Sequence, residues 1–183
     1  NEQLAVLQRN LVVSHACGTG DRVPNEIVRL MLLLKVQSLS YGYSGVQLET
    51  VQRLVDFFNN HVCPVVYQQG SLGASGDLAP LAHISLPLLG VGEVNFEGKD
   101  VPSSEVNQRF GWEPITLQSK EGLALLNGTQ FMAAYGCWCI MNAKRLSAAA
   151  DVTAAISIDA YDGRIEPFHP AVHTIRPHKG QIE

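Results

Sequence analysis

A glycine-rich stretch followed at once by an apolar run constrains the fold of this chain more than any other feature. Residues 70–83 read GSLGASGDLAPLAH, and the first seven positions hold three glycines and three small residues. A backbone with so few Cβ atoms can turn sharply and approach other groups closely. We therefore expect a tight loop here, followed by a helix that begins near Leu78.

The centre of this loop, Ala74-Ser75-Gly76, also suits an unusual covalent reaction. In a tight bend, the amide nitrogen of Gly76 can attack the carbonyl carbon of Ala74 and close a five-membered ring, because glycine has no side chain to block the approach. Ser75 then loses its hydroxyl as water, which leaves an exocyclic methylidene. Such a group is an electrophile that no ordinary side chain supplies.

Three other interpretations compete for this stretch. Short motifs often mislead, and on the triplet alone the commonest outcome is a plain turn with Ser75 or Asp77 as the N-cap of the next helix. A phosphate-binding loop would end in Gly-Lys-Ser/Thr, which is absent here. A nucleophile elbow needs Gly-x-Ser-x-Gly, and Asp77 stands where the last glycine should be.

Composition argues against several classes of protein. The 183 residues are 46% hydrophobic, which is enough for one sizeable core, and the net charge is −4. Basic residues form no patch in the sequence, so neither nucleic acid nor an anionic membrane is an expected partner. The four cysteines lack metal-binding spacing and are expected to be reduced, mostly buried thiols. With no signal peptide before the first amphipathic segment, we expect a cytoplasmic protein.

Hydrophobic periodicity predicts a mainly helical chain. Apolar residues recur at helical spacing in several segments, and alternation around a Gly98-Lys99 turn indicates one β-hairpin. The expected elements are a first helix that ends in a glycine-containing loop within 10–20, helices over 27–39, 46–58 and 78–89, the hairpin over 91–101, a long helix that ends near 158, and a proline- and histidine-rich loop over 167–178.

Residues 122–143 carry no formal charge, which invites a membrane interpretation. The segment contains Asn127, Gly128, Thr129, Gln130 and Asn142, and transmembrane helices avoid such a polar load near their centres. We therefore expect a buried helix of a large helical assembly and no membrane partner.

Two segments, GSLGASGDLAPLAH and KEGLALLNGTQ at residues 120–130, resemble the signatures of the aromatic amino-acid ammonia-lyases. Matches at residues 10–18, 35–46 and 175–181 extend the resemblance over nearly the whole chain. The resemblance implies a mainly α fold. It would be a long-helix bundle of the L-aspartase/fumarase-like kind, incomplete in this chain, with a small β-hairpin and a glycine-rich loop.

The resemblance also implies a prosthetic group and a mechanism. In this family an internal Ala-Ser-Gly forms 4-methylidene-imidazol-5-one (MIO) autocatalytically, so Ala74, Ser75 and Gly76 are its expected source and no external cofactor is needed. The substrate amine adds to the methylidene carbon and departs as ammonia while a base removes the β-proton. Asn127 matches the asparagine that the family places against the substrate carboxylate and MIO; by itself it would indicate only a helix N-cap.

Ser14 and His15 indicate the substrate. A Ser-His pair at this position resembles the histidine-using members of the family, in which an imidazole can hydrogen-bond the substrate imidazole. The implied reaction converts L-histidine to trans-urocanate and ammonia. By itself, His15 would indicate only a partner for the dipole at a helix C-terminus.

Asp77 and His83 are expected to support the loop. Asp77 would aid ring formation or cap the following helix, and the sequence leaves both open. His83 is expected to pack beneath the loop, since the family's base is a tyrosine elsewhere. No metal site is expected, because His169, His173 and His178 have no ligand spacing.

Two family elements are expected to lie outside this chain. A Tyr-Gly-x-Asn-Thr-Gly-Phe-Gly segment, which supplies the proposed base, should precede residue 1, and a Tyr-Ser-x-Arg segment that contacts substrate should follow residue 183. Residues 1–183 are therefore interpreted as the central portion of a longer, homotetrameric enzyme, without its N-terminal tyrosine segment and its C-terminal helical region. We expect this portion to be inactive by itself.

Other functions stay open on the sequence. A tyrosine or phenylalanine ammonia-lyase, or an aminomutase, would share the chemistry, and the pair Ser14-His15 argues against it. A non-catalytic helical assembly module would keep the scaffold with an unmodified triplet. A serine hydrolase that uses Ser75 and His83 is the remaining alternative, and a fluorophosphonate probe would label it.

Overall fold

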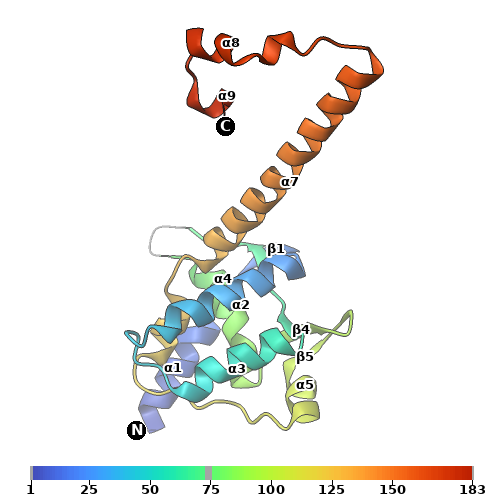
Figure 1. Cartoon of the computed structure of the whole chain (residues 1–183). Helices are drawn as coiled ribbons and strands as arrows, with labels where there is room; N and C mark the ends of the chain where they lie inside the picture. Colours follow the sequence, from blue (N-terminus) through green and yellow to red (C-terminus); the bar gives the residue numbers. More distant parts are fainter. Residues whose placement is uncertain (1, 73–75, 183) are drawn as a thin grey trace. The chain divides into compact units, whose positions relative to one another are not determined.

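A computed structural model describes residues 2–72 and 76–182 of the chain (Figure 1). The chain divides into two compact units, Asn1–Trp138 and Cys139–Glu183, and each is described by itself. The α-helices are α1 Glu2–His15, α2 Asn25–Ser40, α3 Leu48–Asn59, α4 Leu78–Ser85, α5 Ser103–Phe110, α6 Glu121–Leu126, α7 Gln130–Ala160, α8 Pro170–Ile175 and α9 Lys179–Ile182. The 3-10 helices are η1 Leu86–Leu89 and η2 Glu166–Phe168, and the strands are β1 Thr19–Arg22, β2 Cys63–Pro64, β3 Tyr67–Gln69, β4 Glu93–Phe96 and β5 Lys99–Pro102.

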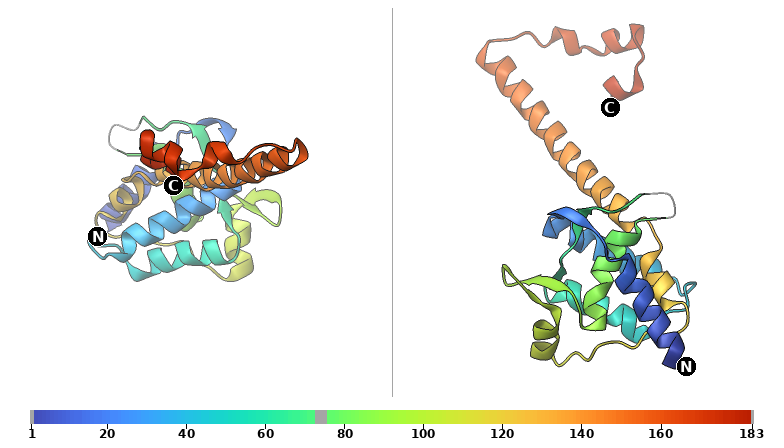
Figure 2. Two further views of the ribbon diagram at one scale, coloured as in Figure 1. Left: turned by 45° about the horizontal axis from the view of Figure 1, so that its top comes forward. Right: turned by 180° about the vertical axis from the view of Figure 1, so that it is seen from behind.

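The helices of the first unit form two neighbouring groups. Helix α1 lies against α4 and α6, and α2 lies against α3 (Figure 2). Buried apolar side chains form two clusters, and α2 contributes to both: Leu32 and Leu39 to one, and Ile27, Val28 and Met31 to the other. A helix that is apolar on most faces is expected to be buried on more than one side. The mainly helical prediction is confirmed.

Short antiparallel strands flank these helices. Strands β2, β4 and β5 form a three-stranded sheet, and β1 pairs with β3. The predicted hairpin is confirmed, but its turn is at Glu97-Gly98, because Phe96 pairs with Lys99. Both turn residues have positive φ, 51° and 78°, as a two-residue type I′ turn requires. Strands β1, β2 and β3 were not predicted, because strands of two to four residues contain too little alternation to detect.

The predicted loop over 167–178 is partly wrong, since η2 and α8 lie within or across it. Pro170 occupies the first position of α8, where its missing N–H removes no intrahelical hydrogen bond. His169 caps this helix, because its Nδ1 accepts a hydrogen bond from the Ala171 backbone N–H at 3.2 Å. Proline and histidine here begin a short helix, although the same residues are typical of loops.

The prediction of mostly buried cysteines is also wrong for the single chain. Cys63 is buried, whereas Cys17, Cys137 and Cys139 are exposed, and all four are free thiols. Cys137 and Cys139 lie on α7 beyond Ala134, the last residue of that helix that the chain buries. Burial of this helix in a larger assembly stays a prediction, because one chain cannot test it.

A buried carboxylate fixes α6 to the start of α3. Glu121, at the first position of α6, is 0% exposed. Its two oxygens accept four hydrogen bonds of 2.6 to 2.9 Å, from the backbone and side-chain N–H groups of Gln47, from Thr50 Oγ1 and from the Gln118 backbone N–H. Four donors replace the water that a buried carboxylate loses. Helix α6 leads directly to Asn127, so this cluster sets the position of the second signature segment.

The cluster predicts a large effect of a small substitution. Glu121→Gln keeps the size of the side chain but replaces one acceptor oxygen with an NH₂ group, which must face a donor. We expect the free energy of unfolding to fall by about 2–4 kcal/mol, since a buried donor is left without an acceptor and charge-assisted bonds are lost. Urea denaturation of the protein that contains this chain measures the effect.

The matched control is Glu113→Gln, because Glu113 is an exposed glutamate. Exposed substitutions of this kind change stability by less than about 0.5 kcal/mol. Equal unfolding midpoints for the two variants would show that the Glu121 cluster does not hold the fold together.

Candidate active site

The glycine-rich loop is held at both of its described ends. Gly73, Ala74 and Ser75 lie outside the described residues, so Gly76 alone represents the predicted triplet. At the start of the loop Gly70 lies against Gly18, and at its end Gly76 lies against Gly128. Segments that are distant in the sequence therefore meet on the two flanks of the triplet.

No side chain fits at Gly76. A Cβ atom there would lie 2.5 Å from the carbonyl oxygen of Gly128, 2.9 Å from the Gly128 nitrogen and 3.2 Å from Asn127 Oδ1. Its φ of 116° is also a conformation that L residues with side chains rarely adopt. Glycine is therefore required here both by the backbone and by its neighbours.

Asp77 ties the end of the loop to the beginning of α7. Its backbone N–H donates to Gly128 O at 2.7 Å, and its side chain is 3% exposed. The carboxylate accepts hydrogen bonds from Ser71 Oγ at 2.8 Å and from the Met132 backbone N–H at 3.1 Å. Met132 belongs to the first turn of α7, where N–H groups have no partner within the helix.

This geometry corrects one of the two predicted roles of Asp77. Asp77 stands at the N-cap position of the following helix, α4, and its carbonyl oxygen accepts a hydrogen bond from the Leu81 N–H at 3.0 Å, but its side chain makes no capping hydrogen bond to that helix. The carboxylate of Asp77 caps α7 instead, because one of its oxygens accepts a hydrogen bond from the Met132 N–H. The other oxygen accepts a hydrogen bond from Ser71 Oγ. A role in ring formation stays a prediction.

His83 lies beneath the start of the loop. Its Nε2 accepts a hydrogen bond from the Gly18 backbone N–H at 3.1 Å, and its ring meets Tyr67 edge-on with centroids 5.2 Å apart. A Cβ atom on Gly70 would lie 3.1 Å from Gly18 Cα, so the loop packs directly on the segment that His83 holds. Because Nε2 is engaged as an acceptor, the proton of the neutral ring is assigned to Nδ1. Burial lowers the pKa of His83 and so favours the neutral ring, and the hydrogen bond that occupies Nε2 favours the predicted packing role over that of a general base.

Ser14 and His15 are the last two residues of α1. His15 Nδ1 lies 2.8 Å from the carbonyl oxygen of Leu11, to which Ser14 Oγ also donates at 3.1 Å. A carbonyl oxygen only accepts, so Nδ1 carries the proton and Nε2 is left as the acceptor of the neutral ring. Within the described residues no hydrogen bond joins this pair to Asn127 or Asp77. Their substrate role stays a prediction.

Asn127 ends α6, so the N-cap indicated by this residue alone is wrong. Its backbone N–H donates to Leu123 O at 2.9 Å, and its φ of −84° and ψ of 132° make it the C-cap of α6. Its side chain is exposed in the single chain, and its carbonyl oxygen accepts a hydrogen bond from Lys35 Nζ at 2.9 Å. Lys35 is 1% exposed, and burial lowers the pKa of its amine to about 8.

Lys35 and Gln130 were not among the predicted site residues. A lysine within an otherwise apolar helix was a usable signal for Lys35, because a buried charge needs a partner. Gln130 carried no such signal. Its Oε1 is buried without a hydrogen-bond partner among the described residues, and its side chain lies where a Cβ atom of Gly128 would be.

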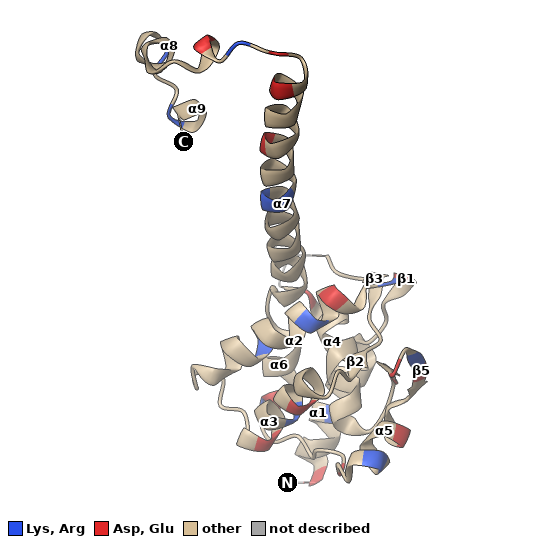
Figure 3. Ribbon diagram, turned by 45° about the vertical axis from the view of Figure 1, so that its right-hand side comes forward, with Lys and Arg blue, Asp and Glu red and all other residues tan. Residues whose placement is uncertain are grey.

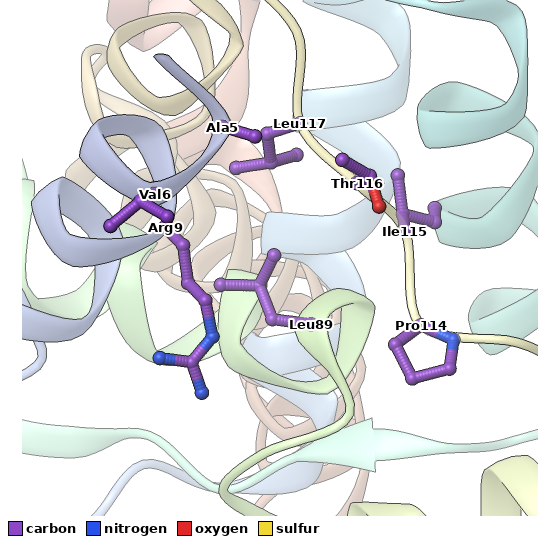
Figure 4. A pocket seen from close by; sticks show the side chains of 8 residues that line it. All are labelled: Ala5, Val6, Arg9, Leu89, Pro114, Ile115, Thr116 and Leu117. Carbon is purple, nitrogen blue, oxygen red and sulfur yellow. The ribbon is translucent and has the colours of Figure 1, made fainter. Parts of the chain in front are cut away.

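A pocket of about 240 Å³ lies elsewhere in the first unit (Figure 4). Its lining is mostly apolar, with Arg9 as the charged side chain; the lining residues are Ala5, Val6, Arg9, Leu89, Pro114, Ile115, Thr116 and Leu117. None of these is a predicted site residue. The candidate active site is therefore defined by the contacts around the loop and not by this pocket.

The described parts of the chain contain neither a basic patch along one element nor a metal-binding cluster. Lys and Arg are scattered over several elements there (Figure 3). No group of three or more His, Cys, Asp or Glu residues within 2–72 and 76–182 is arranged to hold a metal ion. No helix in the same ranges is long and apolar enough to cross a membrane.

The surroundings of Gly76 fit an MIO group. Ring closure requires a backbone nitrogen at this position with no side chain beside it, and the cradle formed by Asn127 and Gly128 admits none. The Asn127 amide lies at the same cradle, where a side-chain donor or acceptor can reach a group formed there.

Two features point to the class of this protein: a fold of packed helices, and a contact at Gly76 that admits only glycine and joins the segments 70–83 and 120–130. The family model described as aromatic amino acid lyase matches residues 1–183, and the chain belongs to this family.

The chain is similar to individual members of this family over nearly its whole length. The chain is 50% identical over 181 residues to the histidine ammonia-lyase of Caldanaerobacter subterraneus subsp. tengcongensis, a match that covers 99% of this chain and 36% of the relative. Among solved structures, histidine ammonia-lyase from Trypanosoma cruzi has a TM-score of 0.92 at 42% identity, over 98% of this chain and 36% of that one. A tyrosine aminomutase from Streptomyces globisporus has a TM-score of 0.91 at 36% identity, over 99% and 34%. The chain spans about a third of the length of these relatives.

The environment of His83 predicts a pH dependence of stability. The unfolded chain has the ordinary histidine pKa near 6.5, whereas burial lowers the pKa in the folded state. As pH falls below about 6.5 the unfolded state binds the proton first, so this contribution to stability is present above pH 6.5 and is lost below it. His83→Gln keeps an acceptor for the Gly18 N–H without titrating, so we expect a smaller loss of stability between pH 7 and pH 5.

Thermal unfolding of the two proteins at several pH values provides the measurement. His178→Gln is the control, because His178 is exposed and should leave the pH dependence unchanged. Parallel curves for wild type and His83→Gln would mean that His83 does not contribute to the acid sensitivity.

Proposed function

We propose that the protein containing this chain is an ammonia-lyase that converts L-histidine to trans-urocanate and ammonia. One observation carries the proposal: the glycine-only contact that sets Gly76 against Asn127 and Gly128. It brings the end of the triplet together with the second signature segment, which supplies an amide at the same place. Relatives named histidine ammonia-lyase at about 50% identity support the choice of substrate.

An MIO group formed from Ala74, Ser75 and Gly76 would supply the electrophile that turns the substrate amine into a good leaving group. Gly76, Asn127 and Gly128 are the described residues that would hold it. The side-chain amide of Asn127 can donate a hydrogen bond where negative charge develops, as an oxyanion-hole donor does. Asp77 keeps the loop in place by linking it to Ser71 and the first turn of α7.

His15 would select the substrate. With its proton held on Nδ1 by Leu11 O, the ring offers Nε2 as an acceptor for an N–H of the substrate imidazole. The phenol of tyrosine can satisfy the same acceptor, but phenylalanine has no polar group for it. A site that leaves a polar group unpaired disfavours the wrong substrate.

We also propose that residues 1–183 are the central portion of a longer, cytoplasmic, homotetrameric enzyme. Support comes from the length of the relatives, of which this chain covers about a third. The four cysteines are free thiols, as expected in a reducing compartment. Within this enzyme a residue outside the chain would remove the β-proton, since His83 Nε2 is occupied by the Gly18 N–H.

The test uses the full-length enzyme and Ser75→Ala, which has no hydroxyl to lose. L-Histidine, L-tyrosine and L-phenylalanine are supplied separately, and ammonia and the organic product are measured. We expect urocanate from histidine and a fall in kcat/KM of at least about a thousandfold in the variant, or roughly 4 kcal/mol of activation free energy. The peptide that spans residues 74–76 should be lighter by two water molecules in the wild type only.

The matched control is Ser104→Ala, an exposed serine that should leave activity unchanged. Turnover of tyrosine or phenylalanine instead of histidine, or a β-amino acid product, would favour the alternative lyase or aminomutase. An unmodified, inactive wild type would favour a non-catalytic assembly module.

Substrate choice should respond to position 15. We expect His15→Leu to lower kcat/KM for histidine by about 10- to 100-fold, because the loss of a hydrogen bond to the substrate costs roughly 1.4–2.7 kcal/mol. The value of kcat/KM for phenylalanine should fall much less, so the ratio of kcat/KM for histidine to kcat/KM for phenylalanine measures the effect. Equal losses for both substrates would remove His15 from substrate selection.

A further inference from the structure

Lys35 is a charged side chain that packing does not explain. It is 1% exposed and ranks among the largest fully buried side chains of the chain. Among the described residues no carboxylate lies within ion-pair distance of its amine, and its hydrogen bond goes to the neutral carbonyl oxygen of Asn127. A buried charge with a neutral partner is costly, and an apolar side chain of similar volume would fill the space at lower cost.

The peptide group that Lys35 binds also faces Gly76. The Asn127 carbonyl and the Gly128 N–H belong to one peptide unit, and no cis peptide bond occurs among the described residues. In a trans peptide the two groups point in opposite directions. Lys35 Nζ lies 2.9 Å from the carbonyl oxygen, and the Gly128 nitrogen would lie 2.9 Å from a Cβ atom of Gly76. Lys35 and Gly76 are thus on the two sides of a single peptide.

Through this peptide, the charge of Lys35 can affect the groups that face the loop. A cation at a carbonyl oxygen polarises the peptide and makes its N–H a stronger donor, and the effect is larger where water is excluded. With a pKa of about 8, the amine is still mainly charged at pH 7. The hydrogen bond also restrains the orientation of the peptide at Gly128, where φ is 147° and a glycine imposes no side-chain restraint of its own.

We propose that Lys35 is a positioning residue for the reaction: its buried ammonium holds the Asn127–Gly128 peptide so that the Gly128 N–H and the Asn127 side chain face Gly76. The inference rests on the proposed function and deepens it. It assigns no contact between Lys35 and the substrate.

The experiment uses the full-length enzyme with Lys35→Met, an unbranched side chain of similar length without charge. Rates are divided by the fraction of chains whose 74–76 peptide has lost two water molecules. We expect kcat per modified chain to fall at least tenfold while KM stays within threefold, because the substrate itself is not contacted. Amide hydrogen exchange of residues 122–132 should become faster, with residues 48–59 of α3 unchanged.

The matched control is Leu39→Met, which changes another buried side chain of α2 while retaining Lys35. We expect kcat, KM and exchange of residues 122–132 to stay within twofold of the wild type. A residue that only maintained the fold would lower the yield of modified, folded enzyme and leave kcat per modified chain unchanged.

Lys35→Arg separates charge from packing, because it retains a cation at the position. Its kcat should be at least ten times that of Lys35→Met. Where the methionine variant does not fold, a folded arginine variant with kcat within fivefold of the wild type supports the proposal.

The proposal is overturned if Lys35→Met keeps kcat within twofold of the wild type, if exchange of residues 122–132 is unchanged, or if Lys35→Arg is no more active than Lys35→Met or fails to fold. An inactive wild type refutes the proposed function alone, and hydrogen exchange still decides the role of Lys35.

Discussion

The close approach of Gly76 to Gly128 is the contact on which the rest of the candidate site depends. It is possible because Gly76 has no side chain, and both glycines have positive φ. Everything around it serves to keep that contact in place: Asp77 binds the first turn of α7, and the Glu121 cluster fixes the helix that leads into Asn127. A side chain at Gly76 would separate the loop from the segment that completes it, and one at Gly128 would collide with the Gln130 side chain.

The buried ionisable groups around this contact share one property. Glu121 and Asp77 accept hydrogen bonds from uncharged donors, and Lys35 donates to a carbonyl oxygen. The described ion pairs lie elsewhere and are mostly exposed, such as those of Arg109 and Arg164. Opposite charges in contact would largely cancel one another's field. Of these three groups, Lys35 has the sign that stabilises a developing negative charge, and its neutral carbonyl partner leaves that field in place.

Much of the fold could be predicted from the sequence, because its main helices are long and periodic. The apolar pattern placed α2 and α3 within two residues of their observed bounds, and the hairpin was recognised from alternation. Short elements were missed for the opposite reason. Strand β2 has two residues and pairs with β4, so only the tertiary structure makes it a strand. The tail helix α8 was missed because proline and histidine are frequent in loops, whereas here they cap a helix.

The parts of the candidate site that depend on neighbouring residues could be predicted from the sequence. The parts that depend on contacts between distant residues could not. A glycine needed for ring closure is visible in the triplet itself, and the space around Gly76 gives a second reason for the same residue. A cap on α4 was one of the two roles predicted for Asp77, because that helix is next in the sequence, yet its carboxylate caps α7, more than fifty residues away. Lys35 shows the same limit: its position in an apolar helix signalled a buried charge, but the carbonyl that receives it lies 92 residues further along the chain. Sequence patterns thus locate the glycine-rich loop, and long-range hydrogen bonds decide how it is held.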